Sequence, residues 1–194
     1  MKVKCRIKIG IFALIMFISL LLTSYNYFII LLFVVILHEL GHIFMAKLCH
    51  IRLSELKLSI FGAALSPSNT LYSYKDEILL CIGGPLSNFV SALIVHMCLG
   101  NILKADIFVM SSLALGIINL LPIIGFDGGR ITLALLSLIL GPRQANGILK
   151  FLSFMFIFIL WLFSVYLLIK IGASLTLFIF SLSLFTKIFI PHAS

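Results

Sequence analysis

Two histidines and a glutamate stand close together in the stretch His38-Glu39-Leu40-Gly41-His42. Residues four positions apart lie on one face of an α-helix, so His38 and His42 can bind the same metal ion. Glu39, between them, is then placed to act as a general base that takes a proton from a water molecule activated by the metal. The surrounding run 27–48 is apolar, and ionisable groups inside such a run are costly and usually functional. The pattern therefore predicts a catalytic metal centre.

A catalytic zinc ion has three protein ligands and one open position, so the two histidines need a further ligand. Asp127 lies in a segment that is apolar overall but is broken by Pro122 and by neighbouring glycines. Irregular backbone at membrane depth occurs where it is buried in protein or lines a polar cavity. Asp127 is therefore the favoured third ligand of one zinc ion per chain. Glu55 is the alternative ligand, and an ion pair between Asp127 and Arg130 is the alternative role for this carboxylate.

The elements that must position these residues are membrane helices. The chain has 194 residues, of which 62% are hydrophobic and 10% are charged. Because an apolar stretch of about 18 or more residues can cross a bilayer, we expect about six transmembrane helices in one domain covering 1–194. The expected spans are 9–24, 27–47, 78–99, 107–140 with an interruption near its middle, 151–169 and 171–190.

The positive charge of the chain predicts its orientation in the membrane. The net charge is +8, which in a soluble protein would suggest a nucleic-acid partner. If the amino terminus is cytoplasmic and six spans alternate, only Lys104 and Lys170 of the 14 Lys and Arg residues lie outside, as the positive-inside rule expects. We therefore predict no nucleic-acid partner, a cytoplasmic amino terminus, and a metal site displaced toward the cytoplasmic side.

The stretch 48–77 is the one sizeable polar loop of the sequence. Within it Leu56, Leu58 and Ile60 alternate with polar residues, which is typical of a strand, and turn-forming residues follow. We expect a short membrane-associated β-hairpin. One hypothesis is that these three residues bind an extended peptide substrate by strand addition. The alternative is a hairpin that only rests on the membrane surface.

The run Gly83-Gly84-Pro85-Leu86-Ser87-Asn88 begins inside the expected third span. Glycine and proline in a membrane helix permit close approach of a neighbouring helix or a local break. Asn88 is then a candidate for donating a hydrogen bond into a buried substrate site. The alternative is that it only links two helices.

These motifs together resemble the site-2 protease family of intramembrane zinc metalloproteases. The elements that carry the resemblance span 38–130: His38 to His42, Gly84-Pro85 with Asn88, and Asn119-x-x-Pro122 followed by Asp127-Gly128. The resemblance implies that His38, His42 and Asp127 bind zinc and that Glu39 activates water. It also implies that Asn119 helps to polarise the substrate carbonyl, and that three helices within about 27–140 form the catalytic core.

Within that family the chain looks most like the stage IV sporulation protease group, because the histidine motif comes early and no PDZ-like segment is inserted. Members of that group cleave a membrane-tethered sigma-factor precursor. They commonly carry a carboxyl-terminal CBS domain, which this sequence is not expected to contain, and they differ from it at 123–126.

The sequence thus predicts an all-α integral membrane zinc metalloendopeptidase, in a bacterial cell membrane. Its expected substrate is a membrane-tethered protein, cut in or near its transmembrane segment, such as a sigma-factor precursor or an anti-sigma factor. The lipid bilayer is an expected partner, and a membrane inhibitory or regulatory protein is a candidate one. The competing hypothesis is a non-proteolytic metal-handling membrane protein, a transporter or sensor that uses the same histidines.

Overall fold

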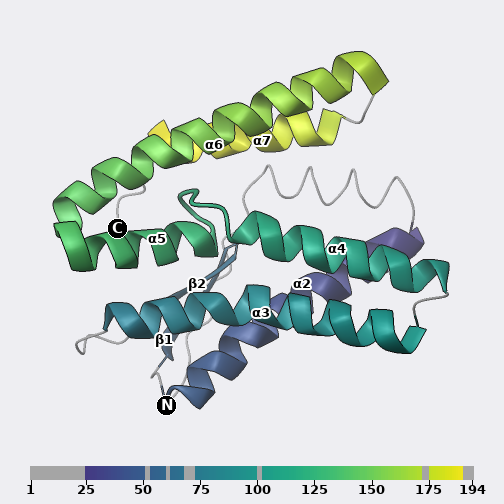
Figure 1. The fold of residues 1–194 in the computed structure, drawn as a ribbon, viewed down its shortest axis with the longest axis horizontal. Helices are drawn as coiled ribbons and strands as arrows, with labels where there is room; N and C mark the ends of the chain where they lie inside the picture. Colours follow the sequence, from purple (N-terminus) through teal and green to yellow (C-terminus); the bar gives the residue numbers. More distant parts are fainter. Residues whose placement is uncertain are drawn as a thin grey trace.

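A computed structural model describes residues 25–50, 53–59, 62–67, 73–99, 102–171 and 175–189. The span expected at 9–24 lies outside these residues. In chain order, the elements shown in Figure 1 are α2 (Tyr25–Leu48), β1 (Leu53–Ser59), β2 (Gly62–Pro67), α3 (Tyr74–Leu99), α4 (Leu103–Asn119), α5 (Asp127–Leu140), α6 (Pro142–Ile171) and α7 (Leu175–Phe189).

Three of the described helices are long and apolar enough to cross a membrane, namely Tyr27–Leu48, Tyr74–Leu99 and Pro142–Lys170. The segment expected to form one interrupted span at 107–140 consists of two helices, α4 of 17 residues and α5 of 14 residues. Large apolar side chains are exposed along all three long helices, as expected for surfaces that face lipid. The prediction of a helical integral membrane protein is confirmed, and the count of six crossings stays a prediction.

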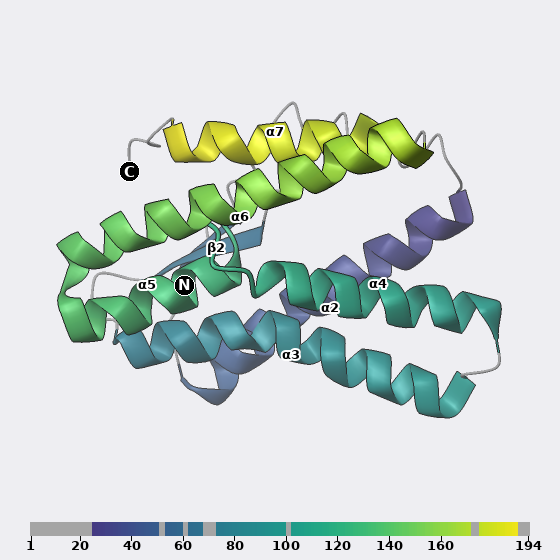
Figure 2. The same cartoon turned by 45° about the horizontal axis from the view of Figure 1, so that its top comes forward.

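Helices α2, α3 and α4 pack against one another around the histidine motif. Helices α3 and α4 run side by side, and α2 crosses them (Figures 1 and 2). At the crossing of α2 and α3, a Cβ atom added to Gly41 or to Gly83 would overlap the other helix. Ser87 Oγ in α3 also donates a hydrogen bond of 2.9 Å to the carbonyl oxygen of Leu37 in α2. The missing side chains let the two backbones approach closely, which brings the histidine face of α2 onto α3.

The remaining helices cover the break between α4 and α5. Helix α5 packs against α3 and α6, and α6 packs against α7, as Figure 2 shows. The main buried apolar cluster joins Ile123 and Phe126 of the break to Ile157 of α6 and Leu184 of α7. Helices α6 and α7 therefore do more than face lipid, because they bury the irregular segment that leads to Asp127.

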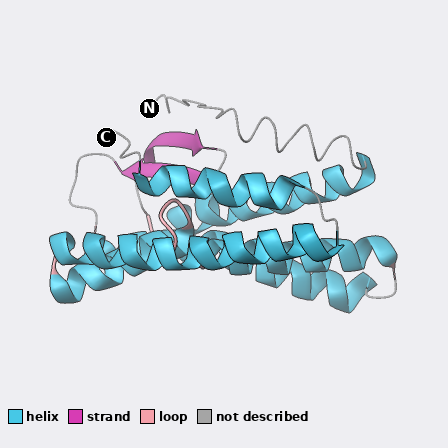
Figure 3. Cartoon of the chain, turned by 90° about the horizontal axis from the view of Figure 1, so that it is seen from above, coloured by secondary structure: helices cyan, strands magenta, loops and turns pink. Residues whose placement is uncertain are grey.

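The two strands pair antiparallel, with Leu56 opposite Leu65 and Leu58 opposite Ala63. They lie outside the helices in Figure 3. Ile60, which the sequence grouped with Leu56 and Leu58, lies outside the described residues, as do the side chains of both strands. Association of the strands with the membrane surface and with substrate stays a prediction.

Candidate active site

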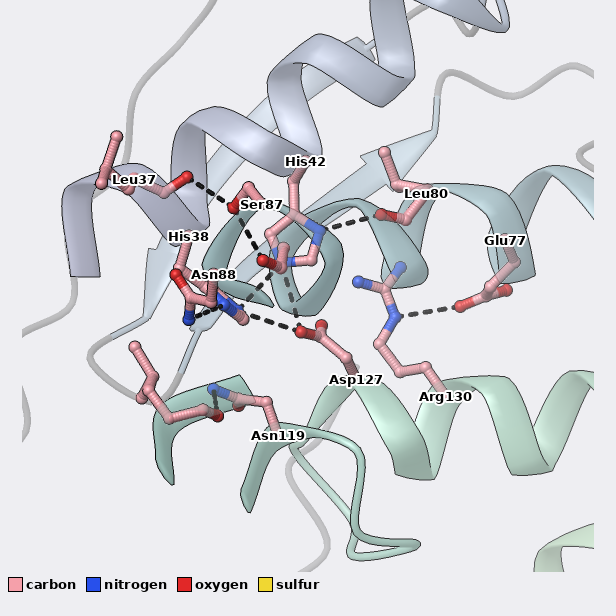
Figure 4. A network of polar contacts seen from close by, with 12 residues as sticks. Leu37, His38, His42, Glu77, Leu80, Ser87, Asn88, Asn119, Asp127 and Arg130 are labelled. Atoms are coloured by element: carbon pink, nitrogen blue, oxygen red, sulfur yellow. Dashed lines mark hydrogen bonds and ion pairs between the residues drawn. The ribbon is translucent and has the colours of Figure 1, made fainter. Parts of the chain in front are cut away.

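Three buried side chains from two distant parts of the chain converge on one point (Figure 4). His38 and His42 come from α2, and Asp127 is the first residue of α5. Asp127 Oδ2 lies 3.1 Å from His38 Nε2 and 3.2 Å from His42 Nε2, and the two Nε2 atoms are 3.3 Å apart. The side chains of all three residues are at most 11% exposed. This arrangement gathers two imidazole nitrogens and one carboxylate oxygen in a site shielded from solvent.

The donor set and its spacing fit a zinc ion. Ligand atoms of a tetrahedral zinc site are about 3.3 Å apart, because each lies about 2.0–2.1 Å from the metal. The three separations of 3.1, 3.2 and 3.3 Å match that value. Two histidines and one carboxylate are also a ligand set of catalytic rather than structural zinc sites, because they leave a fourth position open.

The orientation of His42 is fixed from behind by α3. His42 Nδ1 lies 2.8 Å from the carbonyl oxygen of Leu80. A carbonyl oxygen can only accept, so Nδ1 carries a proton, and in the neutral ring Nε2 then presents its lone pair to the site. The rings of His38 and His42 meet edge to face, with centroids 4.9 Å apart.

Gly84 of α3 packs directly against both imidazole rings. A Cβ atom at this position would lie 2.7 Å from His38 Nε2 and would also overlap His42 Nε2. The rings can occupy their positions over α3 because this residue has no side chain. The Gly-Pro motif noted in the sequence thus contributes space at the point where the ligand atoms meet.

Asp127 is aimed by the irregular segment 120–126. Pro122 cannot donate a backbone hydrogen bond, and Gly125 adopts φ of 95°, a conformation that residues with side chains rarely adopt. The segment then folds back onto the start of α5, where a Cβ on Gly128 would overlap the carbonyl oxygens of Leu120 and Leu121. As the first residue of α5, Asp127 lies at the positive end of the helix dipole, where a carboxylate is stabilised.

Ser153 of α6 satisfies the backbone of this segment. Its Oγ accepts a hydrogen bond of 2.9 Å from the backbone N–H of Ile124. It also lies 3.3 Å from the carbonyl oxygen of Pro122 and donates to that of Leu149 at 2.7 Å. Ser153 is fully buried, and backbone groups at membrane depth need such partners because no bulk water reaches them.

Asp127 shares the site with the histidines, and Arg130 makes an ion pair elsewhere. Arg130 Nε lies 3.0 Å from Glu77 Oε1 in α3 (Figure 4), whereas the sequence left open a pair between Arg130 and Asp127. Glu55, the alternative third ligand, belongs to β1, whose side chains lie outside the described residues.

The other candidate residues lie around the ligand cluster. Glu39 directly follows His38 and is half-buried. Asn119 ends α4, and its Nδ2 donates a hydrogen bond of 3.1 Å to the carbonyl oxygen of Leu115. Asn88 is fully buried and lies against His38. The roles of Glu39 and Asn119 in catalysis and of Asn88 in substrate binding stay predictions.

Reasoning from the sequence missed Ser153 and the carbonyl oxygen of Leu80. A serine among many apolar residues of α6 carries no spacing signal, and a backbone carbonyl has none at all. The break around Pro122 did offer one clue, because its unpaired backbone groups required partners from another helix.

The chain resembles known proteins over most of the described region. The sequence model of Peptidase family M50 matches residues 26–105 and 101–163, which include all three converging side chains. The chain is 36% identical over 118 residues to zinc metalloprotease MJ0392 of Methanocaldococcus jannaschii, a match covering 56% of this chain and 34% of that protein. It is 28% identical over 121 residues to stage IV sporulation protein FB of Bacillus subtilis, covering 60% of this chain and 42% of that protein. The match thus spans less than half the length of either relative.

The fold also has a counterpart among solved structures. The site-2 protease from Methanocaldococcus jannaschii aligns with a TM-score of 0.72 over 97% of this chain and 91% of that chain, at 24% identity. The helices that bring His38 and His42 to Asp127 are therefore arranged as in that structure. With this shared fold and a family match through both parts of the site, the chain belongs to peptidase family M50.

Proposed function

We propose that this chain is an intramembrane zinc metalloendopeptidase of the site-2 protease type. Its reaction is hydrolysis of a peptide bond in or near the transmembrane segment of a membrane-tethered protein. The observation that carries the proposal is the convergence of His38, His42 and Asp127, whose ligand atoms all lie within 4.8 Å of one another inside a membrane helix bundle. Family membership supports the assignment.

In this proposal each residue of the site has a defined task. His38, His42 and Asp127 hold one zinc ion, which when bound supplies a Lewis acid that activates water and polarises the scissile carbonyl. Glu39 accepts the proton of the attacking water and later delivers it to the leaving amine, so that both product termini are formed. Asn119 has a second amide N–H beyond the one that donates to Leu115, and this group donates to the substrate carbonyl oxygen.

The substrate must be extended where it is cut, because a helix hides its own backbone. Strand β1 offers a means of holding the substrate in an extended form. In the two-stranded sheet of the described residues β1 pairs with β2 along one edge, and its other edge remains for an added strand. We therefore propose that the 56–60 stretch, with Leu56, Leu58 and Ile60, binds an extended substrate segment by backbone hydrogen bonds.

The proposed membrane arrangement has six crossings in a single domain covering 1–194, with a catalytic core at about 27–140. The amino terminus and the metal site face the cytoplasmic side, in agreement with the distribution of Lys and Arg. Similarity to stage IV sporulation protein FB supports a role in sporulation, in a bacterial cell membrane. A tethered sigma-factor precursor, or an anti-sigma factor, is the proposed substrate, and a membrane protein that inhibits or regulates cleavage is a proposed partner.

The experiment that tests this function compares wild-type protein with Glu39→Gln in lipid vesicles that contain candidate tethered substrates. We expect Glu39→Gln to keep its bound zinc and to lose cleavage by about 10²–10⁴-fold, because general acid–base catalysis is removed while the ligands remain. Cleavage products are measured on gels, and zinc by elemental analysis of the same samples.

The controls separate the protease from the metal-handling alternative. Removing zinc with a chelator should stop wild-type cleavage, and adding zinc back should restore it. Wild-type turnover by Glu39→Gln would refute its role as the base. Zinc-loaded wild-type vesicles that transport zinc and cleave none of the candidates would instead favour a transporter.

A further inference from the structure

Asn88 lies behind His38, on the side of the ring opposite to the site. Its side chain is fully buried in α3, one turn beyond Gly84. Asn88 Nδ2 lies 3.1 Å from His38 Nδ1, while His38 Nε2 points at Asp127 (Figure 4). The amide therefore touches the one ring nitrogen of His38 that does not face the other ligand atoms.

Which ring nitrogen of His38 carries the proton determines which amide atom of Asn88 can face Nδ1. If Nε2 is to present a lone pair to zinc, the neutral ring carries its proton on Nδ1, and Nδ1 then needs an acceptor. The Nδ2 group of an amide can only donate, so an Nδ1–H facing Nδ2 would be an unfavourable pair of donors. Asn88 Oδ1, meanwhile, is a buried acceptor with no hydrogen-bond partner among the described residues.

A half-turn of the amide removes this conflict. The oxygen and nitrogen ends of an amide have nearly the same shape, so hydrogen bonding decides which end faces a neighbour. Turned in this way, Oδ1 accepts the Nδ1–H of His38 and the two donors no longer face each other. The same arrangement already exists at His42, whose Nδ1 lies 2.8 Å from the carbonyl oxygen of Leu80.

We infer that Asn88 is a positioning residue, whose Oδ1 accepts the Nδ1–H of His38 and thereby holds the ring in the tautomer that leaves Nε2 free. This inference rests on the proposed zinc site, and it gives Asn88 a task distinct from substrate binding. Both histidines of α2 are then oriented by acceptors from the single helix α3, one through a side chain and one through a backbone carbonyl. Such partners fix ring orientation and raise ligand basicity.

The test measures zinc affinity rather than proteolysis, by competition with a chromogenic chelator on the purified full chain in detergent. The variants are Asn88→Leu, which removes the acceptor, and Asn88→Asp, which keeps an acceptor of the same shape and removes the donor. We expect Asn88→Leu to weaken zinc binding by about 10–100-fold, and Asn88→Asp to stay within about threefold of wild type. Asn146→Leu and Asn146→Asp serve as controls, because Asn146 is exposed on α6 and its Nδ2 donates to the carbonyl oxygen of Pro142 in the same helix.

The outcomes separate the inference from the proposed function. Equal losses in Asn88→Asp and Asn88→Leu would overturn the inference, because they would show that Asn88 donates or only fills space. Unchanged affinity in Asn88→Leu would also overturn it. Thermal unfolding of the zinc-free variants shows whether Asn88→Leu is folded, and the Asp variant tests the acceptor even where the Leu variant is not. Wild-type protein that binds no zinc would overturn the zinc site itself.

Discussion

Gly84 shows how little space the site leaves for any added atom. It is the position of α3 directly below His38 and His42, and an added Cβ would lie 2.7 Å from His38 Nε2. Separations under about 3 Å between such atoms are strongly repulsive, and close-packed interiors give way only at a cost. Both rings are held from α3 by contacts at their Nδ1 atoms, so they cannot simply swing away.

Gly84→Ala is therefore expected to lower zinc affinity by more than about tenfold, because the methyl group displaces the two Nε2 atoms from their common point. Zinc affinity is measured by chelator competition. Gly147→Ala is the matched control, since Gly147 also lies inside a helix and a Cβ there meets no atom within 4 Å. Equal zinc affinity in the two variants would contradict the packing of α3 against the histidines.

The three converging residues could be predicted from the sequence, but the residues that hold them in place could not. His38 and His42 have the four-residue spacing that makes two side chains neighbours on one face of a helix, and Asp127 is an acidic residue at a break in an apolar segment. The structure brings their ligand atoms within 4.8 Å. The contact between Asn88 and His38 depends on how α2 and α3 cross, because it joins residues 50 positions apart, and no local pattern encodes that crossing.

Among the helices and loops, α6 supports the 120–126 segment, which leads directly to Asp127. The segment lies between two helices, and its backbone is irregular where the chain is apolar. Ser153 accepts from Ile124 N–H, and Ile157 packs against Ile123 and Phe126. We therefore expect this support to help hold the start of α5, and with it Asp127, in place.

Ser153→Ala should destabilise the protein by about 1–3 kcal/mol, because it leaves the buried N–H of Ile124 without its acceptor. The free energy of unfolding is measured in detergent with a chemical denaturant. Ser164→Ala is the control, since Ser164 is also buried on α6, where its Oγ donates to the carbonyl oxygen of Trp161 in its own helix and lies 3.4 Å from Ser181 Oγ, and neither contact involves the backbone of the break. We expect a smaller loss there, on the order of 0.6 kcal/mol. Equal losses in the two variants would argue against special support of the break by Ser153.

The long helices could be located from the length of the apolar stretches, but the residues against which α6 and α7 pack could not. The expected spans 27–47, 78–99 and 151–169 lie within α2, α3 and α6. Phe, Leu and Ile, in which α6 and α7 are rich, suit lipid contact and helix packing equally, because lipid and protein interior select the same residues. Apolar composition therefore does not reveal which side of α6 buries Ile157 and Ser153.

For the protein as a whole, two native cysteines can report the orientation in the membrane. Cys49 follows α2 and Cys98 lies near the end of α3, so these two residues mark opposite ends of a helical pair. Cys98 is exposed and Cys49 is partly so. In variants that keep only one cysteine, a membrane-impermeant maleimide should label Cys98 in intact cells. It should label Cys49 only after the membrane is opened, because the positive-inside rule predicts that this end is cytoplasmic. The reverse pattern would mean that the amino terminus and the metal site face outward.

The separation of the site along the chain also sets an order of events during synthesis. His38 and Asp127 are 89 positions apart. A ribosome adding about 5–20 residues per second takes on the order of 4–18 s to cover that distance. For that time a nascent chain carries both histidines and the neighbouring glutamate in its first described helix, while the carboxylate that completes their cluster has not been translated. The three-residue cluster can therefore form only after the start of α5 has been made and has folded against α2.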